Sequence, residues 1–327
     1  MTNPILEVSG LNVVFRGARR PIPAVRGIDL RLEPGEVLGL VGESGSGKSV
    51  SMRAALGLLP ATARVTGSVR FLGEELLDKP PARLRALRGA RMSMIFQDPM
   101  TALNPVIPIG EQISEAIRIH DRTVDRQEGL RRARDLLDLV AIPSPEHRLR
   151  QYPFEMSGGM RQRVVIAIAV ANDPELLIAD EPTTALDVTV QAQILEVLRR
   201  LRDRRRIGMV LITHDFGVIA GLADRVAVMY AGRIVETAAV DELFEHPRHP
   251  YTQGLLRATP HINSGVVQAI EGTPPSPNVL TAGCAFAPRC GQAIPACHID
   301  DPVLRPVAGV MAACHVAHAL TPMPADE

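Results

Sequence analysis

The sequence predicts an α/β protein with a parallel sheet, followed by a loop-rich C-terminal appendage. Three short apolar runs end at polar or glycine-rich segments: VLGLV (37–41), LLIAD (176–180) and GMVLIT (208–213). Runs of this length are typical of strands that are buried on both faces of a parallel sheet. All four cysteines lie after residue 283, in a stretch rich in proline. The proline density after about residue 245 predicts a linker and a loop-rich appendage, so we expect the end of the chain to be a separate structural part.

Length and composition agree with this division. The 327 residues, 46% of them hydrophobic, can bury a large core and exceed the usual size of one domain. Acidic and basic residues balance at 36 each, so bulk charge predicts no nucleic-acid partner. The N-terminal stretch lacks a long apolar core and no later run approaches a membrane span, so we expect a cytosolic protein. A reducing compartment disfavours two structural disulfides among the cysteines.

The strongest local pattern is VLGLVGESGSGKS. A strand, a glycine-rich loop and a helix-compatible segment, which reaches the Leu59-Pro60 break, follow in the order of a P-loop. Glycines let backbone N–H groups surround a phosphate chain, Lys48 would reach the β and γ phosphates, and Ser49 would hold Mg²⁺. Lys48 is one of only two lysines in an arginine-rich chain. The predicted nucleotide-binding residues of the loop are Gly42, Glu43, Ser44, Gly45, Ser46, Gly47, Lys48 and Ser49.

Two other strand ends carry candidate catalytic groups. LLIAD ends in Asp180, which suits Mg²⁺ coordination, and Glu181 follows, which suits polarising the attacking water. An isolated Asp-Glu pair is usually solvated surface, but the apolar run before this one favours the catalytic interpretation. GMVLIT precedes His214, at the edge where open α/β folds bind ligands. We therefore expect His214 to contact the γ-phosphate, although a lone histidine is more often structural.

Gln97 and a Ser-Gly-Gly turn complete the pattern. Gln97 follows the apolar run MSMIF, and its amide could contact Mg²⁺ or the water; alone, a glutamine indicates nothing. Ser157, Gly158 and Gly159 open the helix-compatible segment MRQRVVIAIAVA and aim free N–H groups and a hydroxyl at an anion. A simple cap needs only the serine, so the two glycines indicate close approach by something bulky and charged.

In this order the motifs resemble those of the ATP-binding-cassette (ABC) ATPases, over roughly residues 5–245. The resemblance implies a RecA-like P-loop ABC cassette over residues 1–245, with an antiparallel β subdomain and a helical subdomain at about 98–160. It also implies that Asp187 belongs to the D-loop and that Phe15 stacks on adenine, with plain packing as the alternative for Phe15. In this family two cassettes face head to tail, so a second ABC subunit, a copy or a paralogue, would meet the Ser-Gly-Gly turn.

The helical insert has a further implication, and the signature turn differs from the usual family sequence. RQEGLRRARDLLDLV places Leu130, Ala133, Leu137 and Val140 on one stripe of an amphipathic helix. The resemblance implies that this subdomain receives a short helix from the transmembrane permease subunits, of which there are two. The usual signature is Leu-Ser-Gly-Gly-Gln, whereas Met156 and Met160 flank the core here.

The tail narrows the resemblance. HPYTQGLL, a proline-rich stretch and a cysteine-containing end resemble the C-terminal domain of oligopeptide and dipeptide importer ATPases, a group that includes nickel importers; we assign this domain to residues 246–327. The resemblance implies ATP hydrolysis that drives peptide import, at the cytoplasmic face of the inner membrane, with an extracytoplasmic solute-binding protein acting through the permeases. Import of nickel or another small solute is the main alternative. A soluble non-transport ABC ATPase would normally show a coiled-coil insert or two cassettes in one chain, and neither is found in the sequence. A metal-binding protein on a degraded cassette would have lost catalytic groups that are present here.

The cysteines suggest a metal site. Their spacing is C-x5-C-x6-C-x16-C, from Cys284 through Cys290 and Cys297 to Cys314. Zinc sites favour shorter pairs, although His298 and His315 could serve as ligands. Loops that wrap a larger inorganic core tolerate long spacings, and some members of the resembled group are understood to carry such a centre, so we favour a [4Fe–4S] cluster over zinc or plain thiols.

Overall fold

The computed structural model describes residues 3–17, 20–184, 186–259, 269–276 and 282–317. The chain forms two compact units. The first holds Met1–Ile5, Leu32–Glu36 and Asp78–Val210, and the second holds Leu6–Arg31, Val37–Leu77 and Leu211–Glu327. Strand β8 (Gly208–Thr213) runs from the first into the second, and all six of its residues are buried.

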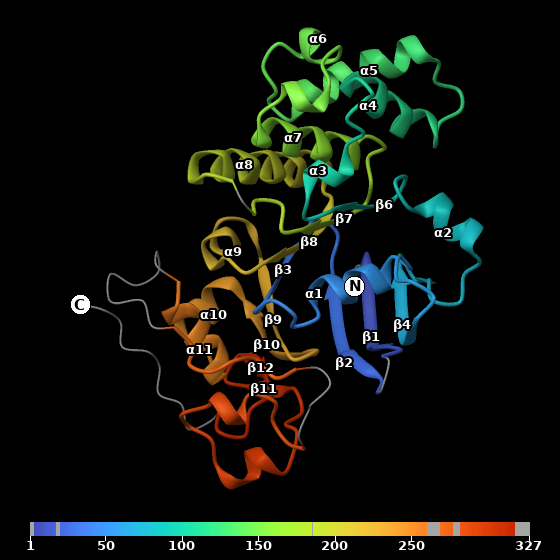
Figure 1. The fold of residues 1–327 in the computed structure, drawn as a ribbon. Coiled ribbons are helices and arrows are strands. Elements are labelled where there is room, and N and C mark those ends of the chain that lie inside the picture. The colour runs from blue at the N-terminus through green and yellow to red at the C-terminus, as the bar shows by residue number, and fades with distance from the viewer. Residues whose placement is uncertain (1–2, 18–19, 185, 260–268, 277–281, 318–327) are drawn as a thin grey trace. The chain divides into compact units, whose positions relative to one another are not determined.

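The first unit is mainly helical. Helices α4, α5 and α7 pack against one another, and α8 packs on α7 (Figure 1). Ala133, Leu137 and Val140 of the predicted stripe are buried and Leu130 is half-buried, so the amphipathic helix is confirmed. The helices are α2 (Pro81–Leu87), α3 (Pro99–Ala102), α4 (Ile109–Arg118), α5 (Arg126–Leu139), α6 (Pro145–Arg148), the 3₁₀ turn η1 (Pro153–Glu155), α7 (Gly158–Ala169) and α8 (Val188–Arg205).

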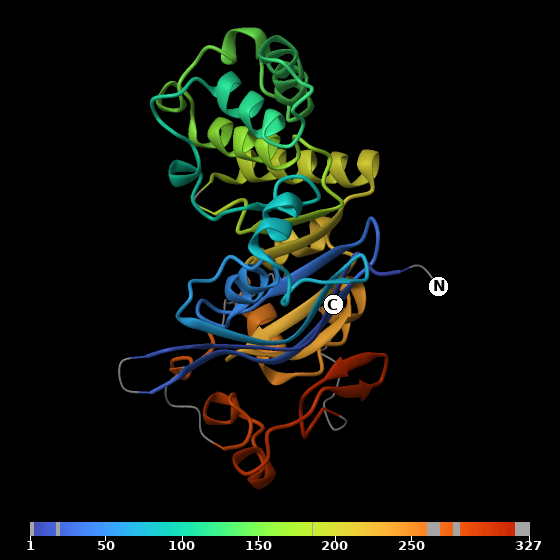
Figure 2. The same cartoon turned by 90° about the vertical axis from the view of Figure 1, so that its right-hand side faces the viewer.

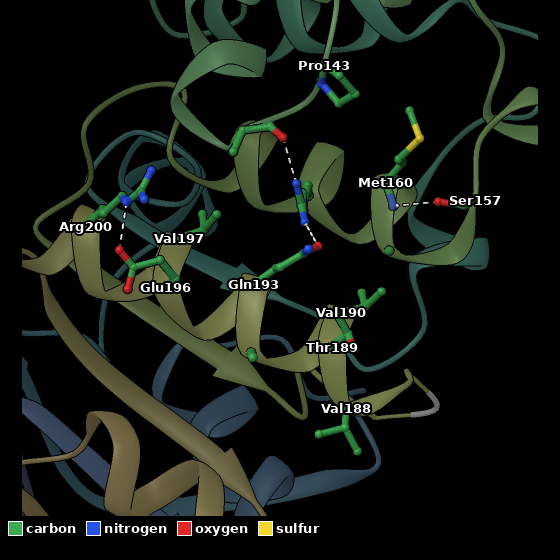
Figure 3. A pocket seen from close by; sticks show the side chains of 14 residues that line it. Pro143, Ser157, Met160, Val188, Thr189, Val190, Gln193, Glu196, Val197 and Arg200 are labelled. Carbon is green, nitrogen blue, oxygen red and sulfur yellow. Dashed lines mark hydrogen bonds and ion pairs between the residues drawn. The ribbon is translucent and has the colours of Figure 1, made fainter.

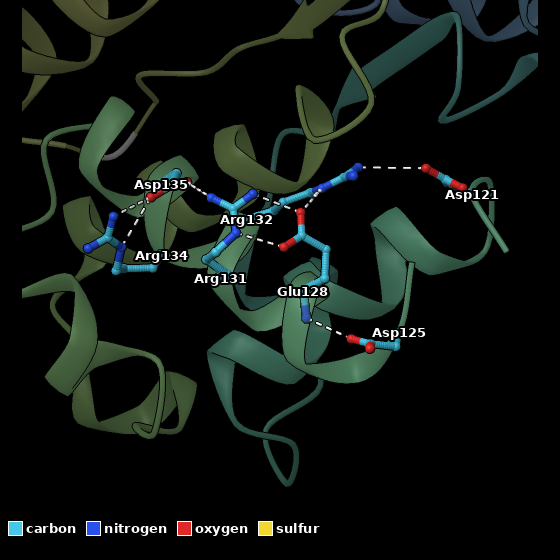
Figure 4. Close-up of polar contacts among 7 residues, drawn as sticks. All are labelled: Asp121, Asp125, Glu128, Arg131, Arg132, Arg134 and Asp135. Atoms are coloured by element: carbon cyan, nitrogen blue, oxygen red, sulfur yellow. Dashed lines mark hydrogen bonds and ion pairs between the residues drawn. The ribbon is translucent and has the colours of Figure 1, made fainter. Parts of the chain in front are cut away.

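The outer face of α5 carries ion pairs. Asp125 caps the helix by accepting the Glu128 N–H at 2.8 Å, and Glu128 in turn pairs with Arg131 at 2.7 Å and Arg132 at 2.8 Å (Figure 4). Hydrogen bonds from Arg131 and then Arg132 lower the pKa of Glu128 to about 2. These side chains are largely exposed, so the pairs support the helix locally and contribute little to global stability.

Two parallel strands of the first unit place the acidic motif. β6 (Met92–Ile95) pairs with β7 (Leu176–Asp180) from Met92↔Leu176 to Ile95↔Ala179. Every residue of β7 is buried, which explains its unbroken apolar run. Because parallel strands end at the same edge, Gln97 and Glu181 both follow this edge.

The second unit contains an antiparallel sheet of order β2-β1-β4-β5. β1 (Leu6–Phe15) pairs with β4 (Ala63–Phe71) along its length, with a bulge between Ser9 and Asn12, and β1 and β2 run side by side in both views (Figures 1 and 2). The other strands are β2 (Ile22–Leu32) and β5 (Glu74–Glu75). The predicted antiparallel β subdomain is thus present.

A second sheet of this unit has the order β11-β12-β10-β9-β3. β3 (Val37–Val41) is parallel to β9 (Arg225–Tyr230), whereas β9, β10 (Arg233–Ala239), β12 (Val310–Ala312) and β11 (Arg305–Val307) are antiparallel in turn. Helices α1 (Lys48–Ala55), α9 (Phe216–Leu222) and α10 (Val240–Glu245) belong to the same unit. α1 is shorter than predicted because the chain turns at Gly57, where φ is +63°.

The tail is more ordered than its proline content predicts. The segment interpreted as a linker contains α11 (Pro250–Arg257), because Pro250 occupies the first helical position and His249 Nδ1 caps the helix by accepting the Tyr251 N–H at 3.0 Å. Two 3₁₀ turns, η2 (Ala287–Arg289) and η3 (Pro295–His298), precede the strands β11 and β12. Across the described residues, none of the helices combines the length and apolar character that a membrane crossing requires.

Candidate functional site

The glycine-rich loop of the second unit folds around Lys48. The Lys48 side chain is buried, and its Nζ donates to the carbonyl oxygens of Gly42 at 2.7 Å and Glu43 at 2.9 Å. At Gly42, φ is +149° and an added Cβ would lie 2.1 Å from the Met229 carbonyl oxygen. Only glycine fits there, so β3 can turn into the loop and aim its amides inward.

The rim of the loop is open. Ser44 and Gly45 are exposed, and with Glu43 and Ser46 they border a cavity of about 240 Å³ whose other wall includes the tail segment 274–276. Ser49 lies in the first turn of α1, where N–H groups of a helix attract anions. A triphosphate fits a loop of this chemistry, and the individual binding roles stay predictions.

Two other predicted residues lie in this unit. Phe15 ends β1 opposite Ala63 and is half-buried. His214 follows β8 and is exposed, and Asp215 caps α9 by accepting the Gly217 N–H at 2.8 Å. Adenine stacking by Phe15 and phosphate contact by His214 remain predictions.

In the first unit, the structure brings Gln97 and Glu181 together. Gln97 Nε2 donates to Glu181 Oε2 at 2.8 Å, and Thr184 Oγ1 donates to the same oxygen at 2.8 Å. Glu181 has φ +51°, an uncommon backbone conformation for a glutamate and one that often marks functional sites. Asp180 is fully buried at the end of β7. Thr184 was not predicted as a site residue, although it lies only three positions after Glu181.

The Ser-Gly-Gly turn begins α7. Ser157 Oγ accepts the Met160 N–H at 3.3 Å, as a helix cap does. An added Cβ on Gly159 would lie 2.4 Å from Val190 Cγ1, whereas one on Gly158 would meet only Leu186 at 3.8 Å. Close packing of α7 on α8 therefore gives Gly159 a reason that the sequence reasoning did not consider, beside the predicted approach of a charged group.

A large cavity adjoins this turn and was not predicted. It measures about 1020 Å³ and is lined by Ser157, Gly159 and Met160 together with side chains of α8 (Figure 3). Arg163 spans its wall, donating to the Ala141 carbonyl at 2.7 Å and to Gln193 Oε1. Asp187 caps α8 by accepting the Val190 N–H at 2.9 Å, so the predicted D-loop residue also fixes the start of this helix.

The four tail cysteines are free thiols that lie near one another. The Cys284 N–H donates to the Cys297 carbonyl at 2.8 Å. Burial first, and then the neighbouring cysteine thiolates, raise the pKa of Cys314 to about 11. Burial is also the largest cause of the raised pKa of Cys284 and Cys290, and nearby backbone N–H groups offset part of the rise at all three thiols.

Within the ranges that the structure describes, no three or more His, Cys, Asp or Glu side chains are arranged to hold a metal ion. The [4Fe–4S] cluster and its zinc alternative therefore stay predictions. His315 Nε2 lies 2.8 Å from the Asp300 carbonyl oxygen, so it is engaged elsewhere.

The P-loop and the acidic strand end together define a class, the P-loop nucleotide-binding proteins. Comparison with known families refines this class. Residues 25–184 match the family model described as ABC transporter, and residues 235–297 match the one described as oligopeptide/dipeptide transporter, C-terminal region.

The curated relatives agree with these two family matches. The chain is 53% identical over 309 residues to "Oligopeptide transport ATP-binding protein OppD" of Mycobacterium tuberculosis, covering 94% of this chain and 50% of that protein. It is 49% identical over 316 residues to "Putative peptide import ATP-binding protein" of Brucella abortus (strain 2308), covering 96% and 95%. The chain thus spans about half the length of the mycobacterial relative and nearly all of the Brucella one. It belongs to the ATP-binding proteins of ABC transporters, in the group with the oligopeptide/dipeptide C-terminal region.

Solved structures confirm the cassette fold. The dimeric structure of MJ0796, described as a bacterial ABC transporter cassette, superposes with a TM-score of 0.65 at 24% identity, over 72% of this chain and 98% of that one. The structure of cbiO1 from Clostridium perfringens, part of the cbiONQ complex, gives 0.62 at 27% identity, over 74% and 91%.

Proposed function

We propose that this protein is the ATP-hydrolysing subunit of an ABC transporter that imports di- or oligopeptides. The observation that carries the hydrolytic part is the pair of hydrogen bonds that hold the Glu181 carboxylate beside the buried Asp180. The names of the mycobacterial and Brucella relatives support peptides as the cargo, in preference to nickel or another small solute.

The nucleotide roles follow the chemistry of the residues. The loop from Gly42 to Ser49 binds the phosphates through its amides and the Lys48 ammonium, and Phe15 stacks on adenine. Ser49, Gln97 and Asp180 hold Mg²⁺, which neutralises phosphate charge when bound.

Glu181, which follows the acidic strand end, acts in the hydrolysis step. Glu181 accepts the proton of the attacking water, while Gln97 and Thr184 fix the orientation of its carboxylate by bonding the same oxygen. His214 contacts the γ-phosphate. Ser157, Gly158, Gly159 and Asp187 act on the nucleotide of a second ABC subunit.

Replacing Glu181 tests the assignment. Glu181→Gln keeps the shape and both acceptor contacts but removes the base, so we expect ATP binding to persist and hydrolysis in the assembled complex to fall by roughly 10²- to 10⁴-fold. The matched control is Glu146→Gln, because the Glu146 side chain is 76% exposed and pairs only across the surface with Arg134. Steady-state hydrolysis that is unchanged in Glu181→Gln would remove the assigned role.

Partners and location extend the proposal. Residues 1–245 form the nucleotide-binding domain, and its helical part at about 98–160 receives the two transmembrane permease subunits. A solute-binding protein delivers cargo to the permeases from outside, and this chain sits at the cytoplasmic face of the inner membrane. The relative cbiO1, as part of a transporter complex, supports assembly with other subunits.

The tail, residues 246–327, holds a [4Fe–4S] cluster in this proposal. The four cysteines are its ligands in this proposal, with zinc on the same thiolates as the alternative. The bond from the Cys284 N–H to the Cys297 carbonyl at 2.8 Å supports a shared site by holding two of these residues together. We expect protein purified without oxygen to be brown and to contain iron and sulfide, and Cys314→Ser to lose both. Colourless, zinc-loaded protein would contradict the cluster.

A further inference from the structure

An arginine of the tail forms a bidentate ion pair with a glutamate of the glycine-rich loop. Arg289 Nη1 donates to Glu43 Oε2 at 2.7 Å and Nη2 donates to Glu43 Oε1 at 2.9 Å. The Arg289 side chain is 5% exposed and that of Glu43 is 25% exposed. The two residues are 246 positions apart in the sequence and belong to the same unit. A paired guanidinium fork of this kind is among the stronger polar contacts in proteins.

The remaining contacts fix the guanidinium in place. Arg289 Nε donates to the Glu271 carbonyl oxygen at 2.9 Å, and Nη1 donates to the Tyr230 hydroxyl at 3.3 Å. The guanidinium carbon lies 5.9 Å from the ring centroids of both Tyr230 and Phe286. Lysine cannot reproduce this set, because it lacks the planar fork that satisfies Glu43, Glu271 and Tyr230 together.

Glu43 connects this tail arginine to the phosphate-binding ammonium. Its carbonyl oxygen accepts from Lys48 Nζ at 2.9 Å, and its N–H donates to the Tyr251 hydroxyl at 2.7 Å. Tyr251 is fully buried and packs against Tyr230 and Phe286, with ring centroids 4.5 Å and 5.4 Å away. The backbone and the side chain of Glu43 are thus both held by groups that follow the cassette's loop by about 200 residues or more.

The contact with Arg289 also neutralises the charge of Glu43. A carboxylate in a loop that receives a triphosphate repels its ligand, and a half-buried position weakens solvent screening of that repulsion. Arg289 cancels this charge. Loss of Arg289 would therefore both free the loop and leave an uncompensated negative charge beside the phosphates.

We propose that Arg289 is a positioning residue for nucleotide binding: by neutralising and fixing Glu43 it keeps the loop competent to receive ATP. This inference rests on the proposed ATP binding by the loop. The turn that carries Arg289, η2, is joined to Cys284, whose carbonyl oxygen accepts the Ala287 N–H at 3.0 Å. The cysteine-containing tail thereby acts on ATP affinity through one side chain.

The test measures the Kd of a fluorescent ATP analogue on the full chain, and KM and kcat for ATP in the assembled complex. We expect Arg289→Ala to raise Kd and KM by about tenfold, since a buried hydrogen bond to a charged group is typically worth enough for that change. Because Arg289 does not touch the reacting atoms, kcat should change by less than about threefold. A structural role alone would lower kcat and the folded fraction together.

The matched control breaks another ion pair of the tail. Asp301 pairs with Arg26 at 3.5 Å and with Arg233, away from the loop. We expect Asp301→Asn to change Kd by less than about twofold, since it leaves Glu43 and Arg289 in contact. An equal loss of affinity in Asp301→Asn would overturn the proposal, because general loosening of the tail would then explain the effect.

Removing the negative charge as well gives a sharper test. In the double variant Glu43→Gln/Arg289→Ala no negative charge remains at this pair, so Kd should fall at least about threefold below that of Arg289→Ala alone. If adding Glu43→Gln to Arg289→Ala does not lower Kd, the electrostatic argument is refuted. It is also refuted if Arg289→Ala binds ATP as tightly as the unmodified protein does. If Arg289→Ala does not fold, Arg289→Lys takes its place, with an expected rise in Kd of several-fold, and an unchanged Kd overturns the proposal.

If the proposed ATP binding is wrong, the result differs from the one expected when only the inference about Arg289 is wrong. If the unmodified protein does not bind the ATP analogue at all, ATP binding by the loop is wrong irrespective of Arg289. If it binds and Lys48→Ala abolishes binding while Arg289→Ala has no effect, only the inference about Arg289 falls.

Discussion

Replacing Gly159 with alanine separates two explanations of the Ser-Gly-Gly turn. The added Cβ would lie 2.4 Å from Val190 Cγ1, which is closer than packed carbons tolerate, and 3.4 Å from Val190 Cγ2, which is an ordinary contact. Overpacking by one methyl group costs about 1–3 kcal/mol, and the helix preference of alanine over glycine returns up to about 1 kcal/mol. We therefore expect Gly159→Ala to lower the free energy of unfolding by about 1–2 kcal/mol.

Val190→Ala removes the clashing Cγ1 together with Cγ2 and serves as the second single variant of a double-mutant cycle. In that background Gly159→Ala should be neutral or stabilising by up to about 1 kcal/mol, which gives a coupling energy of about 2 kcal/mol. Urea unfolding of the four proteins measures this coupling. Additive effects within about 0.5 kcal/mol would refute the packing argument. If stability returns in the double variant while hydrolysis in the assembled complex stays low, the glycine also serves the approach of a ligand.

The remaining predictions concern the phosphate loop and the tail helix. Lys48→Ala should weaken ATP binding by at least about tenfold, measured with the fluorescent analogue, because it removes the loop's only ammonium; unchanged affinity would refute phosphate binding there. Complete burial lowers the pKa of His249 to about 3, and since this is a base with a depressed pKa, its contribution to stability is present above about pH 6.5 and is lost as the pH falls toward 3. At pH 5 the loss is about 2 kcal/mol, from 1.5 pH units at about 1.4 kcal/mol each. His249→Asn keeps an acceptor for the Tyr251 N–H, so the drop in unfolding free energy between pH 7 and pH 5 should shrink by that amount; an identical drop in both proteins would contradict it.

Short-range patterns in the sequence predicted the cassette elements well. The runs that became β3, β7 and β8 are continuous because both faces of each strand are buried, and this pattern needs no knowledge of partners. Gln97 was predicted to contact Mg²⁺ or the water, whereas its hydrogen bond to Glu181 follows from the parallel pairing of β6 with β7, which the sequence did not predict.

What the sequence did not reveal depends on contacts between distant segments. Nothing local to Arg289 distinguishes it from the other arginines of the chain, because its role comes from Glu43. Gly159 was explained by a ligand because Val190 is 31 positions away and its contact is invisible in the pattern. The proline-rich stretch predicted a linker, yet proline at the first helical position and a histidine cap begin α11.

The last described strands of the chain finish a sheet that begins near its start. Glu236 and Thr237 of β10 pair with Ala312 and Met311 of β12, and β11 then forms the outer border. During synthesis, β10 must therefore wait for about 75 further residues before its outer backbone groups find a partner. Until those residues leave the ribosome, this row of unsatisfied N–H and C=O groups is a template for association with other chains. A truncation before residue 305 would make that exposure permanent and would favour aggregation even with every nucleotide-binding residue intact.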